Sequence, residues 1–126
     1  MNSKSLEIGI AIDTLLNPIC EVYPIIADKG ATYPFIVYRR TALGEVNTKD
    51  LKVSGYIETA TVELVIASTK YKDSIDLTEQ VKETLERTRG NIQGIKIQNI
   101  EVINATETWA NDAYLQVLTC RIDIEK

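Results

Sequence analysis

Apolar residues recur along the chain with two different periods, and each period predicts a different kind of element. Over residues 5–16 the apolar positions follow one stripe of an amphipathic helix, formed by Ile8, Ile12, Leu15 and Leu16. Ser3 or Ser5 could cap this helix. Pro18 ends it, because proline lacks the N–H that the next helical hydrogen bond needs. The sequence therefore predicts a short helix at the start of the chain.

Three strands are predicted in the next part of the sequence. Residues 19–27 contain Pro24, which favours a short strand at the edge of a sheet. Residues 33–41 are rich in aromatic and β-branched residues and predict a second strand. In the third strand, residues 59–66, apolar residues recur at every second position, so the even-numbered residues should face the core: Ala60, Val62, Leu64 and Ile66.

Residues 73–89 are the most clearly specified helix. Asp73 or Ser74 can cap its start, and Gly90 fits the position just after its end. Its apolar stripe is narrow and consists of Leu77, Val81 and Leu85, with Ile75 nearby. A narrow stripe predicts a surface helix that packs one face on a sheet and leaves the rest in water.

The end of the sequence predicts two more strands. In the first, Ile95 and Ile97 share one phase and Ile100 and Val102 the other, which predicts a bulge near Gln98 and Asn99. Residues 104–112 are polar and are interpreted as a turn that carries the only tryptophan. Residues 114–124 alternate again and predict the closing strand.

The predicted order is helix, three strands, helix, two strands, which defines an α+β fold. The expected architecture is a mixed or antiparallel sheet with an N-terminal helix and one longer helix packed on it. A chain of 126 residues is close to the size of one domain, so we expect residues 1–126 to form a single domain.

The amino-acid composition narrows the range of functions that the chain could have. The chain has 14 basic and 18 acidic residues and a net charge of −4, which argues against a protein whose main task is to grip nucleic acid. It has no histidine, the commonest general base and metal ligand. Cys20 and Cys120 are far apart and form no metal-binding pair, and we interpret both as small buried residues. We expect neither a signal peptide nor a membrane span, and a cytosolic location.

The remaining motifs favour structural roles over catalysis or nucleic-acid binding. The chain has no phosphate-binding glycine loop, and the carboxylate pairs Asp73/Asp76 and Glu83/Glu86 have the spacing of solvated side chains on a helix. Arg39 and Arg40 are expected to pair with acidic residues across the sheet rather than to clamp nucleic acid. We therefore expect no catalytic residues, no cofactor and no metal, and a protein that is not an enzyme.

Two features point to partner contacts. Residues 44–55 are polar, lack any period and carry both signs of charge, as expected of a loop that orders on assembly. Trp109 is expected to be either a core plug or an anchor for a partner, and the sequence leaves both open. The candidate interface residues are Glu45, Asn47, Thr48, Lys49, Asp50, Lys52 and Trp109.

Taken in order, these segments resemble a known family. The opening helix is followed by Val22-Tyr23-Pro24, residues 33–38, a polar loop, residues 58–64, the surface helix and the closing residues 112–119. This order resembles the tail-completion, or tail-terminator, proteins of tailed phages along nearly the whole chain. The resemblance implies a hexameric ring in the virion tail, assembled in the bacterial cytoplasm, which ends the tail tube and joins it to the head connector.

The charge of the chain is compatible with this resemblance, because an acidic ring lets DNA pass without holding it. Two alternatives remain. A regulatory α+β domain that binds a small molecule and forms a dimer would have the same composition. An enzyme is the third choice, since it would have to work through carboxylates, tyrosine or lysine alone.

Overall fold

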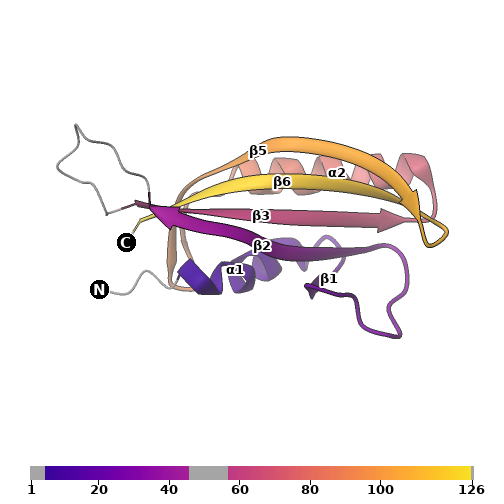
Figure 1. Cartoon of the computed structure of the whole chain (residues 1–126), viewed down its shortest axis with the longest axis horizontal. Coiled ribbons are helices and arrows are strands. Elements are labelled where there is room, and N and C mark those ends of the chain that lie inside the picture. Colours follow the sequence, from indigo (N-terminus) through magenta and orange to yellow (C-terminus); the bar gives the residue numbers. More distant parts are fainter. Residues whose placement is uncertain (1–4, 46–56, 126) are drawn as a thin grey trace.

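The computed structural model describes residues 5–45 and 57–125, which form two helices and six strands (Figure 1). A short 3₁₀ turn (Ser5–Glu7) precedes helix α1. The elements in chain order are α1 (Ile8–Leu16), β1 (Glu21–Pro24), β2 (Phe35–Glu45), β3 (Ile57–Ser68), α2 (Tyr71–Glu86), β4 (Gly90–Ile92), β5 (Ile95–Ala110) and β6 (Ala113–Glu125). The predicted α+β class and its order are confirmed, and β4 is an additional short strand.

All six strands belong to one sheet, in the order β1-β2-β3-β6-β5-β4. β1 runs parallel to β2, and every other pairing is antiparallel. Helix α1 packs against β1 and β2, whereas α2 packs against β3, β5 and β6. Both helices lie behind the sheet in the view of Figure 1, so no described helix covers its other face, which we call the open face.

The core lies between the sheet and the two helices. The four even-numbered residues predicted to face the core on β3 are all buried, with exposures of 0–1%. Val81 and Leu85 of α2 are also buried, and Leu77 packs against the same cluster from its margin. From α1, the buried residues are Ile8, Ala11, Ile12 and Leu16. Aliphatic contacts of this kind hold both helices to one face of the sheet.

Helix α2 differs from the prediction at both ends. It begins at Tyr71, and Lys70 stands at the N-cap without a side-chain hydrogen bond. Neither Asp73 nor Ser74 caps it; the Ser74 hydroxyl instead donates to the carbonyl of Tyr71 at 2.6 Å. Gly90 does not end the helix. With φ at +103° it opens β4, because the chain turns back after Glu86 to pair with β5.

The prediction of a polar turn over residues 104–112 is wrong. β5 continues to Ala110, and only Asn111 and Asp112 form the turn to β6. Both have positive φ, 53° and 60°, as a tight hairpin turn of type I′ requires. The predicted bulge near Gln98 and Asn99 is confirmed by a shift of register between Ile97 and Asn99, and a second shift follows between Val102 and Asn104.

Candidate assembly interface

The predicted interface residues divide into two groups. Glu45 is the last residue of β2, where the backbone pairs with Glu58. Asn47, Thr48, Lys49, Asp50 and Lys52 lie outside the described residues, so their proposed contacts stay predictions. Trp109 is the one candidate whose side-chain surroundings the structure describes.

Trp109 is not a core plug. It lies on β5 one residue before the end of the strand, and its side chain is 54% exposed. Its ring packs edge-to-face against Tyr114 of β6, with ring centroids 4.7 Å apart. Tyr71 of α2 packs against the same ring of Tyr114 at 5.4 Å. These aromatic residues lie together at the surface, where the β5–β6 hairpin meets the start of α2.

A carboxylate completes this cluster. Glu107 of β5 accepts hydrogen bonds from the Tyr71 hydroxyl at 2.9 and 3.0 Å and from the Gln116 amide at 3.0 Å. Hydrogen bonds from Gln116 and then Tyr71 hold the pKa of Glu107 below its usual value. The bond to Glu107 in turn raises the pKa of Tyr71. The cluster borders a cavity of about 220 Å³ that is lined by Tyr71, Glu107, Thr108, Trp109, Tyr114 and Gln116. We call it the hairpin pocket.

One edge of β5 is open. β4 pairs only with Ile95–Ile97, so along the rest of β5 the edge that faces away from β6 meets no other described strand. Such an edge offers backbone N–H and C=O groups to a strand of another chain. Between residues 98 and 110 it has no proline or lysine, the residues that commonly block such pairing, and Ile103 is 50% exposed there. The bulges near Asn99 and Ile103 interrupt this edge, and residues 104–110 are its longest stretch without one.

The open face of the sheet has a mixed polar and apolar surface. Arg39 pairs with Glu63 at 3.5 Å, as predicted, and Arg121 pairs with Glu101 at 3.1 Å. Arg40 does not follow the prediction. It lies opposite Val62, on the side of the sheet that the helices cover, and donates to the carbonyl of Leu6 at 3.0 Å. Arg39 and Arg40 thus lie on opposite faces of β2 and do not form one basic patch.

The carboxylates of the pairs Asp73/Asp76 and Glu83/Glu86 are at least partly exposed on α2, in line with the prediction of solvated side chains, and three of them form ion pairs. Asp76 pairs with Lys72 at 3.0 Å, Glu86 with Lys82 at 3.0 Å and Glu83 with Arg87 at 3.6 Å. Exposed pairs of this kind contribute little to stability, because water and salt screen them. Within residues 5–45 and 57–125, no three His, Cys, Asp or Glu side chains are grouped as metal ligands.

The two cysteines are held as thiols. Burial raises the pKa of Cys120 to about 12 and that of Cys20 to about 11, with a smaller contribution from a nearby glutamate in each case. Cys120 is buried as predicted, whereas Cys20 is only half-buried. A thiol with so high a pKa is a weak nucleophile at neutral pH. In the part of the chain that the structure describes, no helix is long and apolar enough to cross a membrane.

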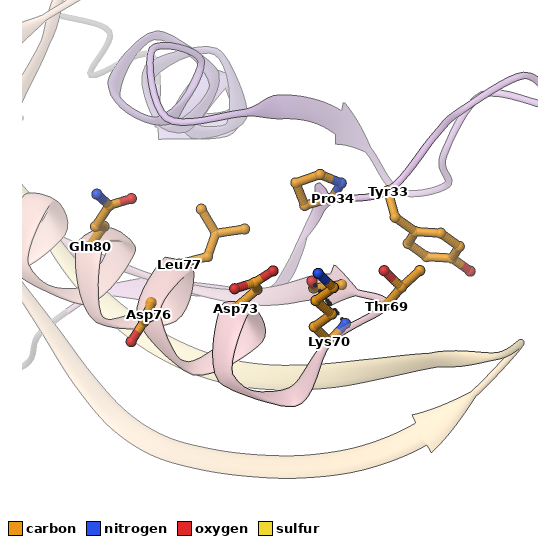
Figure 2. Close-up of a pocket in the computed structure, with 9 residues that line it drawn as sticks. Tyr33, Pro34, Thr69, Lys70, Asp73, Asp76, Leu77 and Gln80 are labelled. Atoms are coloured by element: carbon orange, nitrogen blue, oxygen red, sulfur yellow. Dashed lines mark hydrogen bonds between the residues drawn. The ribbon is translucent and has the colours of Figure 1, made fainter.

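A second cavity lies beside the first half of α2 (Figure 2). It has a volume of about 330 Å³, at the bottom of the range of about 300–1,000 Å³ for small-molecule sites. Figure 2 shows Asp73, Leu77 and Gln80 from α2 on one side, and Tyr33 and Pro34 from the segment before β2 on the other. Its lining also includes Ser68, Thr69, Lys70 and Asp76, so most of the residues around it are polar.

Comparison with known proteins gives a structural likeness only. No known family matches the sequence, and no curated protein matches it. Among solved structures, a chain of the virion of a native gene transfer agent particle has a similar fold, with a TM-score of 0.60. The likeness covers 91% of this chain and 84% of that chain at 10% sequence identity. At this identity the likeness establishes a shared fold.

Proposed function

We propose that this chain is a structural subunit of a phage-like particle and that it forms the ring that terminates the tail tube. The observation that carries the proposal is the fold shared with a chain of a gene transfer agent virion over 91% of the length of this chain. The order of segments that resembles the tail-terminator family supports the same conclusion independently. In this role the chain catalyses no reaction, and its functional residues are those that touch neighbouring subunits.

A closed ring requires a head-to-tail contact in which two different patches of each subunit meet. The two edges of the sheet have different lengths, so they could supply the two different patches. One end is β1, a strand of four residues, and near the other end β5 leaves a long edge open. In the proposed ring, the open edge of β5 is one of the two patches.

The other partners follow from the same role. The ring would contact the tail tube on one side and the head connector on the other. Its contacts would include Glu45, Asn47, Thr48, Lys49, Asp50, Lys52 and Trp109. Its net charge of −4 per subunit would repel DNA from the lumen and allow passage without binding. The protein would assemble in the cytoplasm of the host and remain in the virion tail.

The alternative of a dimeric regulatory domain has less support. The cavity in Figure 2 is of minimal size for a small molecule. A third cavity, also of about 330 Å³, is lined by Glu79, Lys82, Glu83, Glu86 and Arg87, four of which already pair with each other. Neither cavity has the apolar lining with a few converging polar groups that small-molecule sites have.

The test compares two single substitutions. Ile103→Lys places a charge on the open edge of β5, where lysine prevents strand pairing. Ile10→Lys makes the same exchange on the outer side of α1 at nearly equal exposure, 51% against 50%. We expect native mass spectrometry to show oligomers for the parent and for Ile10→Lys, and monomers for Ile103→Lys. Oligomers of equal size for both variants would contradict the role of the β5 edge.

A further inference from the structure

We propose that the hairpin pocket binds an arginine or lysine side chain of a partner protein. The inference rests on the proposed function, because an assembly role supplies the protein partner, but it concerns the chemistry of one site. Three elements build this site: Tyr71 begins α2, Glu107 and Trp109 lie on β5, and Tyr114 and Gln116 lie on β6.

The aromatic residues give the pocket its attraction for cations. Trp109 and Tyr71 both pack edge-to-face on Tyr114, with interplanar angles of 67° and 63°. Both side chains remain accessible, at 54% and 45% exposure. A guanidinium or ammonium group near aromatic faces is attracted by the negative charge above the ring, most strongly by tryptophan.

Glu107 adds a negative charge at the same place. Two donors, the Tyr71 hydroxyl and the Gln116 amide, fix the position of its carboxylate. A carboxylate can accept about four hydrogen bonds, so Glu107 has capacity for donors from a ligand. Within the described residues it forms no ion pair with a lysine or arginine of its own chain, although the neighbouring glutamate on this strand, Glu101, does. The pocket therefore presents an anion without a cationic partner.

Size and position favour a side chain of a protein over a free small molecule. The cavity of about 220 Å³ is below the range of about 300–1,000 Å³ for small-molecule sites. It adjoins the open edge of β5, where a partner backbone could pair and direct a side chain into the pocket. One basic side chain of a partner bound along this edge would fit the volume of the cavity and its negative charge, and it could enter from the edge of β5.

Trp109 provides the measurement, because it is the only tryptophan in the chain and its fluorescence reports on this pocket alone. The probes are N-acetyl-arginine amide and its uncharged analogue N-acetyl-citrulline amide, added to the purified full chain at low salt. We expect a saturable change of fluorescence with the arginine probe and binding weaker on the order of tenfold with the citrulline probe. Added salt should weaken the arginine signal. Equal binding of both probes, or no saturable change with arginine, would overturn the inference.

Two variants locate the effect. Glu107→Gln keeps the size of the side chain and removes its charge, so the preference for arginine over citrulline should disappear. Glu101→Gln removes a carboxylate on the same strand that pairs with Arg121 outside the pocket, and it should leave both titrations unchanged. The Trp109 emission maximum and the circular dichroism spectrum should match the parent in both variants. Arginine preference that survives in Glu107→Gln would overturn the inference.

The outcome also separates this inference from the proposed function. If rings form but the arginine probe does not bind at Trp109, the inference fails and the proposed function stands. If the probe binds as expected but no rings or other assemblies form under any condition, the proposed function fails and the cation preference of the pocket remains.

Discussion

The two faces of β3 show how one strand serves two purposes. Its even-numbered residues, from Ala60 to Ile66, lie under the helices with 0–1% exposure. Its odd-numbered residues face the open side of the sheet, where Thr59 donates to Asp123 at 3.1 Å and Glu63 pairs with Arg39. The covered face holds the fold together by apolar burial, whereas no described helix covers the open face. Substitutions on the two sides should therefore act on different properties.

The largest effect is expected from a charge placed in the covered core. Val81 of α2 is fully buried. Val81→Asp should lower the free energy of unfolding by roughly 4 kcal/mol or more, because it buries a carboxylate without a partner. Gln80→Asp, at the exposed neighbouring position, is the control and should change it by less than about 0.5 kcal/mol. Urea denaturation followed by circular dichroism measures both, and equal midpoints for the two variants would refute the packing of α2.

Truncation on the two faces of β3 sharpens the comparison. Leu64→Ala removes a fully buried side chain and should cost about 2–5 kcal/mol. Val65→Ala, on the open face, removes a half-buried side chain and should cost about 1 kcal/mol. The same denaturation experiment compares them. A larger loss for Val65→Ala would mean that the open face contributes more to folding than the covered one.

The covered face should also give the protein a distinct dependence on pH. Cys120 lies on this face, and burial raises its pKa from 9.0 to about 12. The unfolded thiol ionises near pH 9 while the folded thiol stays protonated, so its contribution to stability is complete below pH 9 and is lost as the pH rises toward 12. Cys120→Ala should therefore reduce the slope of stability against pH in this window. An unchanged slope would show that Cys120 ionises as freely in the folded protein as in the unfolded one.

The smallest effect is expected for the ion pair on the open face. Arg39 and Glu63 are 3.5 Å apart, and both side chains are partly exposed. Arg39→Ala should change the free energy of unfolding by at most about 1 kcal/mol, since exposed pairs are screened by water and salt. Thermal unfolding at low and high salt measures it. A loss as large as that of Leu64→Ala would remove the distinction between the two faces.

The sequence predicts the covered face well because burial imposes a period on it. The alternation of β3 and the stripe of α2 both appear in the structure as predicted. The sequence-based prediction fails for the second half of β5. Residues 103–109 are all exposed there, so no apolar period marks the strand. The turn signal that could have been used is Asn111-Asp112, two residues that tolerate positive φ.

The hairpin pocket could not be predicted for a different reason. Glu107 and Gln116 lie opposite each other on the β5–β6 hairpin, but Tyr71 is 36 residues from Glu107 in the sequence, and only the packing of α2 on the hairpin brings it to them. Trp109 could be singled out as an aromatic residue in an expected turn, but its partners depend on the register of β5 and β6. Periodicity reports burial, and a surface site built from several elements leaves no periodic trace.

The central claim is that this chain assembles into a ring that ends a tail tube. Negative-stain electron microscopy of the purified chain, alone and mixed with the tail tube protein of the same phage, tests it most directly. The account predicts closed rings of uniform diameter, and tubes capped by one ring where tube protein is present. Monomers or dimers alone in both preparations, with tubes left uncapped, would contradict it.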